Sequence, residues 1–304
     1  MLKFLVAGIP HTTFPRNTIE GIKRVAELGL DGMELEWVHQ VPYNEDMANK
    51  VKILAKQLKV VLTVHGSYYI NLASDDDKIW HASISRIVKA LNIGSLSGAS
   101  KLTFHIGFYQ NHDYEKVISR VEKGLKKILE LAENRNQIII SPELTGKMSQ
   151  FGTLEELVIL ASKLKIGFCI DFSHLHARTN GKYNSSKEIQ EIINLVKKRL
   201  GSYYLNTMYF HLSGILYSEK GERRHVCFLE STDEYRKSDI SLSNWDKVKL
   251  HPKVFQKGGP DLDWKMILEV LKKNKIGGYL VCESPSLEQD TLLLKRFYNS
   301  IEVN

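Results

Sequence analysis

The sequence predicts an α/β fold, a (β/α)8 TIM barrel formed by a single domain over residues 1–304. Short runs of β-branched and other apolar residues alternate along the chain with longer segments of helical apolar spacing, which is the pattern of repeated βα units. The alternation occurs eight times, and no Gly/Ser/Pro-rich linker divides the chain. Eight successive βα units favour one closed parallel barrel over two separate domains.

The elements follow in order from this alternation. The expected strands are Lys3–Ala7, Gly32–Glu36, Val60–His65, Leu102–His105, Gln137–Glu143, Ile166–Asp171, Tyr209–His211 and Gly278–Glu283. The expected helices are Thr18–Leu28, Glu45–Leu58, Asp77–Gly98, Asp113–Ala132, Thr153–Lys163, Ser186–Leu200, Asp261–Lys273 and Leu287–Ile301. Thr153 and Glu156, three residues apart, match a capping box at the fifth helix, and Ser286 suits the start of the last one.

One segment interrupts the alternation of strands and helices. Between the last two units we expect a long loop insertion at about 212–260, where a few residues would suffice. Its part from Arg236 to Lys257 is basic, with Arg236, Lys237, Lys247, Lys249, Lys253 and Lys257 against Asp239 and Asp246. The segment is either a solvated surface loop or a contact for nucleic-acid phosphates, and length and charge do not separate the two.

Composition excludes some classes of protein. Hydrophobic residues make up 43% and charged residues 25%, as in ordinary globular enzymes. The longest apolar runs have the length of strands rather than of membrane spans, and the N-terminus lacks the apolar region of a signal peptide, so no membrane partner is expected. The formal net charge of +7 permits a polyanionic partner without requiring one.

The cysteines indicate a reducing compartment. Cys169, Cys227 and Cys282 are odd in number and lack CxxC spacing, so they predict neither a disulfide framework nor a cysteine zinc knuckle. We therefore expect a cytoplasmic protein.

The chemistry is indicated by the strand ends. Six consecutive expected strands, from the third to the eighth, end in His, Asp or Glu; these residues are His65, His105, Glu143, Asp171, His211 and Glu283. In a (β/α)8 barrel the carboxyl ends of the strands converge on one rim, where the active site lies. Imidazoles and carboxylates are ligands for zinc and manganese, and bound cations would relieve the repulsion between clustered carboxylates.

Each of these residues also has a structural interpretation. A single His is more often hydrogen-bonded than metal-bound, and Glu143 or Glu283 could cap a neighbouring helix. However, the six recur at intervals of 40, 38, 28, 40 and 72 residues, the last containing the insertion. His174 and His225 follow two of the strand ends, so eight candidates exceed the needs of one zinc. Clustered metals suit phosphodiester hydrolysis.

These residues lie in segments that resemble a known family. The segments are Val64–Leu72, Phe104–Gly107, Pro142–Gly146, Cys169–His174, Phe210–Ser213 and Cys282–Pro285. In order and spacing they resemble the endonuclease IV (deoxyribonuclease IV) family of abasic-site endonucleases, AP endonuclease family 2, whose barrel is of the xylose-isomerase-like type. Gly214 after His211-Leu212-Ser213, and Glu222 three residues before His225, resemble the archaeal-type branch.

The resemblance implies a ligand set. His65 and His105 would hold one Zn2+, and Glu143 would bridge it to a second and take part directly in catalysis. Asp171, His211 and Glu283 would complete the second site. His174 and His225 would belong to a third site. Two or three zinc ions are therefore expected, with Mn2+ as the alternative metal.

It also implies a substrate. The enzyme would act, as a monomer, on double-stranded DNA containing abasic sites in base excision repair. It would hydrolyse the backbone 5′ to the lesion and leave a 3′-hydroxyl and a 5′-deoxyribose phosphate. Tyr68 and Tyr69 match a pair that enters the duplex beside the abasic nucleotide, although packing on the rim is the alternative for both.

Two departures from the family pattern affect these implications. The family's Asp-x-His before the third metal is replaced by Arg223-Arg224-His225, and we expect Glu222 to supply the missing carboxylate. The Arg-bearing loop after the second strand is replaced by residues 37–40, Trp-Val-His-Gln.

Two other functions remain open. A metal-dependent sugar isomerase or epimerase of the xylose-isomerase-like barrel group would also gather Glu, Asp, His and Glu around one or two metals. A nucleic-acid binder without activity would share the basic charge, but a complete set of unused buried carboxylates is costly.

Overall fold

The computed structural model confirms the (β/α)8 barrel; it describes residues 1–110, 112–132, 137–228, 230, 250–257 and 259–302. Eight parallel strands form one sheet in the order β6-β4-β3-β2-β1-β12-β9-β8. Their bounds are β1 Leu2–Ala7, β2 Gly32–Glu36, β3 Val61–His65, β4 Lys101–Thr103, β6 Ile139–Ile140, β8 Ile170–Asp171, β9 Met208–Leu212 and β12 Gly278–Cys282. A parallel bridge between Glu143 and Cys169 joins the two outermost strands and closes the sheet.

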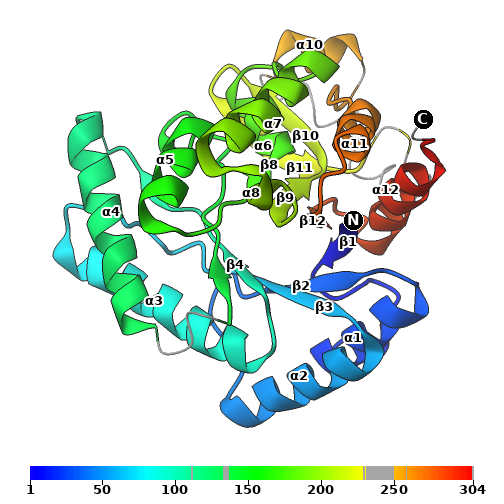
Figure 1. Ribbon diagram of the computed structural model, residues 1–304, viewed down its shortest axis with the longest axis horizontal. Helices are drawn as coiled ribbons and strands as arrows, with labels where there is room; N and C mark the ends of the chain where they lie inside the picture. The colour runs from blue at the N-terminus through cyan, green and yellow to red at the C-terminus, as the bar shows by residue number, and fades with distance from the viewer. Residues whose placement is uncertain (111, 133–136, 229, 231–249, 258, 303–304) are drawn as a thin grey trace.

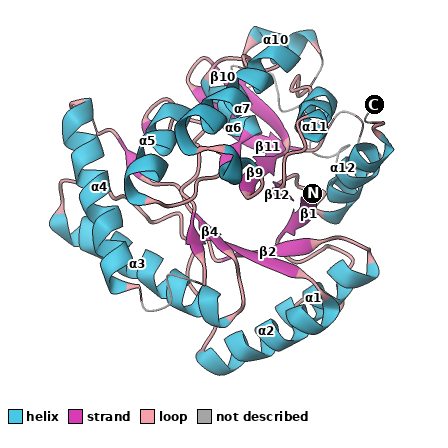
Figure 2. Cartoon of the chain, in the orientation of Figure 1, coloured by secondary structure: helices cyan, strands magenta, loops and turns pink. Residues whose placement is uncertain are grey.

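Helices surround the strands (Figures 1 and 2). They are α1 Thr18–Glu27, α2 Glu45–Leu58, α3 Asp77–Leu96, α4 Tyr114–Leu131, α5 Leu154–Leu164, α7 Ser186–Leu200, α11 Trp264–Lys273 and α12 Glu288–Ser300. The capping box is confirmed, because Thr153 and Glu156 make both reciprocal bonds at the start of α5. Ser286 does not cap the last helix, whose N-cap position is Leu287. None of the described helices has both the length and the apolar character needed to cross a bilayer.

Two strands are markedly shorter than expected, and β4 ends early. The predicted strand Gln137–Glu143 is regular only over Ile139–Ile140, because Pro142 has no N–H to donate. Ser141 N and Glu143 N still donate to the carbonyl oxygens of Leu102 and Phe104. The predicted strand Ile166–Asp171 is reduced to Ile170–Asp171, and β4 ends two residues before His105. The candidate ligands on these units therefore lie at strand ends or just beyond them.

Several elements were not expected from the sequence. They are the antiparallel pair β10 Gly214–Ser218 and β11 Gly221–Val226, the short pair β5 Gly107–Phe108 and β7 Gln150–Phe151, and the helices α6 Phe172–Arg178, α8 Ser202–Leu205 and α10 Pro252–Gln256. The β10–β11 hairpin and α10 lie within the segment predicted as an insertion. Ile215, Tyr217 and Val226 of the hairpin pack with Leu250 and Val254 in a cluster of their own.

The main core lies between the barrel wall and the surrounding helices. On β9, for example, Met208, Phe210 and Leu212 belong to this core. Tyr209, between them, belongs to a second and much smaller cluster with Leu5, Cys169 and Val281 inside the barrel. The interior is therefore apolar only in part, and the remaining inward positions carry the side chains of the candidate site.

Candidate metal centre

A cavity of about 460 Å³ opens at the carboxyl ends of the strands. We call it the bowl. Its lining includes seven of the predicted ligand residues: His65, His105, Glu143, His174, Glu222, His225 and Glu283. Tyr68 also lines it. Asp171 and His211 are completely buried.

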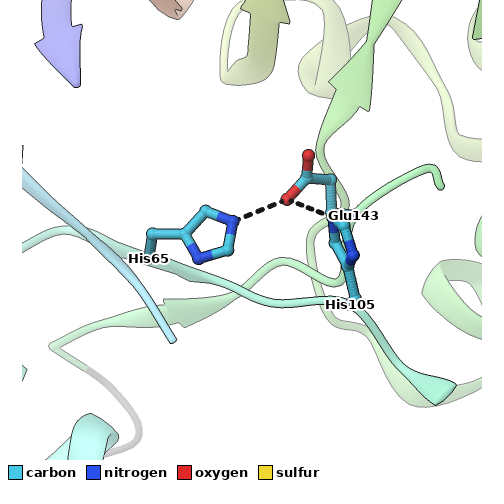
Figure 3. A group of neighbouring side chains, drawn as sticks. All are labelled: His65, His105 and Glu143. Carbon is cyan, nitrogen blue, oxygen red and sulfur yellow. Dashed lines mark hydrogen bonds and ion pairs between the residues drawn. The ribbon is translucent and has the colours of Figure 1, made fainter. Parts of the chain in front are cut away.

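The first group of side chains joins three successive βα units (Figure 3). His65 is the last residue of β3, His105 follows β4, and Glu143 lies on the bridge that closes the barrel. Glu143 Oε2 lies 3.2 Å from His65 Nε2 and 3.6 Å from His105 Nε2. Both histidines thus approach the same carboxylate oxygen, and the three side chains could hold one metal ion.

The second group lies deeper and consists of Glu143, Asp171, His211 and Glu283. His211 Nδ1 lies 3.3 Å from Glu143 Oε1 and 3.0 Å from Glu283 Oε1. Glu143 therefore offers one oxygen to each group. This is the arrangement expected of a carboxylate shared by two metals.

The third group consists of Asp171, His174 and His225. Asp171 ends β8 and caps α6, since its Oδ1 accepts a hydrogen bond of 2.8 Å from His174 N. The cap fixes His174 beside Asp171, and the β10–β11 hairpin brings in His225, whose Nε2 lies 3.0 Å from His174 Nε2. Glu222, on the same hairpin, lies 3.5 Å from His174 Nε2 and 4.0 Å from His225 Nε2.

Unpaired polar atoms show that the groups fit metal ions. Among the described side chains, Glu143 Oε1, Asp171 Oδ2 and His211 Nδ1 are buried without a hydrogen-bond partner. All three belong to the second group. A buried polar atom without a partner is costly, and one cation would satisfy these three together. The donor set of imidazole nitrogens and carboxylate oxygens suits zinc or manganese.

Protonation states in the absence of metal also indicate a place for cations. Burial opposes protonation of His65, but its contact with Glu143 and the charges of Glu36 and Glu34 raise its pKa to about 10. The pKa values of His174 and His211 are likewise raised well above the usual value, against the effect of burial. Surrounding carboxylates raise that of His174, and Cys169 together with surrounding carboxylates raises that of His211. Burial alone would raise the pKa of Glu143, yet His211 and His105 hold it well below the usual range. In the absence of metal, the positive charge of the protonated histidines thus compensates the negative charge of the carboxylates. Bound metal ions would take over this compensation.

The predicted aromatic pair lies on the rim. Tyr68 is 60% exposed and Tyr69 59% exposed, so packing does not account for their positions. The Tyr68 ring lies 5.9 Å from that of His65. In the loop that departs from the family pattern, Trp37 is buried, whereas His39 is exposed with its ring 6.3 Å from Tyr68 and 6.2 Å from Tyr69.

Two carboxylates near the bowl were missed in the sequence. Glu34 is completely buried inside the barrel, and Glu36 lines the bowl. Loss of hydration, with the neighbouring charges of Glu34 and Glu283, raises the pKa of Glu36 to about 8 despite His65. The sequence does contain a pattern that indicates them, because both residues occupy alternate positions of one strand. In the sheet they pair with Thr63 and His65 of β3. Polar residues at a period of two within a strand buried on both faces indicate a functional interior.

Most of the predicted basic segment lies outside the described residues, including Arg236, Lys237, Lys247 and Lys249. Within the described part, Lys253 Nζ donates to Gly181 O at 2.9 Å. Lys253 therefore anchors α10 to the segment after α6.

Comparisons with known proteins give a family and two kinds of relative. Residues 22–299 match the xylose isomerase-like TIM barrel family. An uncharacterized protein of Methanocaldococcus jannaschii is 32% identical over 302 residues, 99% of this chain and 98% of its own. A protein of Thermoplasma acidophilum named "Probable endonuclease 4" is 28% identical over 266 residues, 84% of this chain and 89% of its own.

Solved structures share the fold at low identity. Endonuclease IV from Thermus thermophilus superposes with a TM-score of 0.67 at 16% identity, covering 98% of both chains. A D-tagatose 3-epimerase-like protein superposes equally well, with a TM-score of 0.67 at 16% identity over 98% of this chain and 96% of the other. The backbone alone therefore does not separate these two kinds of enzyme.

Proposed function

Because the chain belongs to the xylose isomerase-like TIM barrel family, we propose that it is a metal-dependent hydrolase that cuts DNA on the 5′ side of abasic sites. It would leave a 3′-hydroxyl and a 5′-deoxyribose phosphate and would act in base excision repair as a single-domain monomer. Within the described residues, the three buried cysteines form no disulfide, which suits a reducing cytoplasm.

The observation that carries the proposal is the sharing of ligands between metal groups. Glu143 belongs to the first and second groups, and Asp171 belongs to the second and third. Such sharing favours two or three Zn2+ ions close together, with Mn2+ as the alternative. Metals so placed supply a nucleophile from water near neutral pH and neutralise the attacking and leaving oxygens of a phosphodiester.

The chain's own residues divide the remaining work. Glu143 holds the first two groups at a fixed separation through its two oxygens. Tyr68 and Tyr69 present exposed rings beside the bowl, where they would occupy the gap left by a displaced nucleotide. An abasic nucleotide lacks stacking and pairing, so its displacement costs less than that of an intact one.

The named relatives support the same function. Proteins called "Probable endonuclease 4" match this chain over as much as 84% of its length. The site also includes His65, His105 and His174, which lie outside the second group. It therefore has more candidate ligands than one sugar-binding metal requires.

A second candidate, a metal-dependent sugar isomerase or epimerase, is supported by the equal superposition of the epimerase-like protein. The second group, with two glutamates, an aspartate and a histidine, would suffice for such chemistry at one metal. On that interpretation, the first and third groups would have no assigned role.

One assay separates the candidates. The metal-loaded protein is incubated with a duplex carrying a single reduced abasic analogue, with and without a chelator. The reduced sugar excludes β-elimination, so a cut must be hydrolytic. We expect incision on the 5′ side, abolished by prolonged chelation. Intact DNA together with conversion of a free ketose would support the epimerase instead, and salt-sensitive binding without incision would support an inactive binder.

A further inference from the structure

Glu34 has no role in the three metal groups, yet its carboxylate contacts His211 of the second group. It is the third residue of β2 and is completely buried inside the barrel. Its Oε1 lies 3.1 Å from His211 Nε2. We propose that Glu34 is a positioning residue that fixes the tautomer of His211 and so directs Nδ1 to the second metal. This inference rests on the proposed metal-dependent function.

The two nitrogens of His211 face opposite partners. Nδ1 faces the carboxylates of the second group, at 3.3 Å from Glu143 and 3.0 Å from Glu283. Nε2 faces Glu34. Within the described residues, neither Nε2 nor Glu34 Oε1 has an aligned hydrogen-bond partner. Two complementary atoms 3.1 Å apart, both buried and otherwise unpaired, are each other's available partners.

The orientation of the Glu34 carboxylate is fixed from its other side. Oε2 accepts a hydrogen bond of 2.7 Å from Thr63 Oγ1 and a second one from the Tyr209 hydroxyl. Thr63 pairs with Glu34 in the sheet register, and Tyr209 lies two residues before His211 on β9. The same strands that hold metal ligands thus hold the donors to Oε2, and Oε1 is left for His211.

The physical consequence concerns the proton on the imidazole. A carboxylate at Nε2 favours the proton on that nitrogen, which leaves the lone pair of Nδ1 free to bind a metal. It also makes the ring a stronger ligand. Partners of this kind contribute about 10- to 100-fold to metal affinity.

The alternative is that Glu34 only fills space and is held there by Tyr209 and Thr63. Glu34→Gln distinguishes the two, because Thr63 and Tyr209 both donate and would draw the amide oxygen to the Oε2 position. The amide NH2 would then face His211 Nε2, which would have to accept and leave the proton on Nδ1. The substitution therefore preserves the shape of the side chain but blocks the metal-facing nitrogen.

The test is metal binding by the full chain without DNA. Protein freed of metal by a chelator is titrated with Co2+, and Zn2+ is then used in competition, so that both affinity and the visible Co2+ spectrum are recorded. We expect Glu34→Gln to weaken binding at the second site by about 10- to 100-fold and to change the spectrum of the Co2+ bound there.

Two control variants isolate the contact. Glu156→Gln alters another buried carboxylate that accepts from a tyrosine hydroxyl, at 2.7 Å from Tyr109, but that lies in the α5 cap away from the metal groups. It should lower stability without changing metal affinity. Glu36→Gln makes the same substitution on the same strand, without the contact to Nε2, and should have a smaller effect at the second site.

Parent-like affinity in Glu34→Gln, or equal losses in Glu34→Gln and Glu36→Gln, would overturn the proposal. If Glu34→Gln does not fold, the double variant Thr63→Val with Tyr209→Phe keeps the carboxylate but removes the donors to Oε2. An unchanged Co2+ spectrum in that variant would overturn it equally. The metal titration contains no DNA, so its result does not depend on nuclease activity. If metal binding depends on Glu34 but the protein cuts no abasic duplex, this inference stands and only the proposed nuclease function fails.

Discussion

The two faces of the barrel wall are built on different principles, although they share every strand. The outward positions of β3, Leu62 and Val64, join the large core beneath the helices. The inward positions of the same strand, Thr63 and His65, carry a hydrogen bond to Glu34 and a candidate metal ligand. Alternate residues of one strand thus contribute to the stability of the core and to the candidate site.

The difference shows why the interior can hold so many charges. The apolar cluster inside the barrel includes only Leu5, Cys169, Tyr209 and Val281 among its fully buried members, so it contributes little of the apolar burial. The outward face supplies most of that burial and leaves the inward face free to hold charged groups. We expect changes on the inner face to affect metal and DNA, and changes on the outer face to affect unfolding.

The largest expected effect is on the inner face, at Glu143. Glu143→Gln keeps the shape of the side chain but removes a charge shared by two groups, so incision of the reduced abasic duplex should slow by several orders of magnitude. Metal content and the midpoint of thermal unfolding are measured beside the rate. A variant that folds and cuts at nearly the parent rate would show that Glu143 joins no metals.

The matched change on the outer face is Leu62→Ala. Leu62 is buried in the main core, so its truncation should lower the free energy of unfolding by about 2–5 kcal/mol. The rate of incision per folded molecule should be unchanged, because Leu62 points away from the bowl. Denaturant unfolding at saturating metal gives the first quantity. Loss of metal without loss of stability would contradict the division between the faces.

Much of the fold was predictable because the outward face is regular. Strand bounds such as Gly32–Glu36 and helix bounds such as Glu45–Leu58 and Ser186–Leu200 agree with the structure, since each combines a clear apolar period with polar ends. The β10–β11 hairpin was not predicted. It depends on tertiary contact: an added Cβ at Gly221 would lie 2.3 Å from the Gly146 carbonyl oxygen, a constraint that no local pattern reveals.

The candidate site was predictable to a similar degree. The strand-end positions were found because six units repeat the same feature, and the structure brings these residues together. Glu34 and Glu36 were not predicted as site residues because they lie in the second unit, ahead of the segments that resemble the family, which begin at Val64. The shared position of Asp171 between two groups was also missed, because it depends on the turn into α6.

After removal of the metals, the stability of the protein should depend on pH through a residue of the inner face, His65. In the metal-free protein the folded-state pKa of His65 is about 10, above an unfolded value of about 6.5. Its stabilising contribution is fully present below the unfolded pKa and is lost as the pH rises toward 10. The thermal midpoint of chelated protein should therefore fall between pH 7 and 10 more steeply than that of metal-free His65→Gln. Parallel curves would contradict a protonated His65.

At the rim we expect a smaller and selective effect. Tyr68→Ala should weaken binding to abasic duplex by about 1–3 kcal/mol more than binding to undamaged duplex, since a wedge acts only where the helix opens. Tyr203→Ala is the control, because Tyr203 is 76% exposed on α8, which precedes β9 and so lies at the opposite end of the barrel. Titrations with labelled duplexes measure both. Equal losses on the two duplexes would indicate general affinity.

The smallest expected effect concerns Glu222 and the third group. The structure places Asp171 with His174 and His225, so this group has three ligands before Glu222 is counted. The charges of His174 and His225 outweigh burial and lower the pKa of Glu222, so that its carboxylate is ionised and available as a fourth ligand.

Glu222→Gln should therefore weaken the third metal without removing the other two. We expect elemental analysis during graded chelation to show three metals in the parent, one of which leaves first, and to show that this one leaves at a lower chelator concentration in the variant. Glu219→Gln, at the turn of the same hairpin, lies outside the three groups and should behave as the parent does. The Glu222 carboxylate lies within 4.0 Å of the imidazoles of His174 and His225. Among the ion pairs of the described residues, none joins Glu219 to either imidazole. A parent that holds only two metals, or a Glu222→Gln curve that overlays the parent curve, would assign Glu222 to the hairpin surface instead.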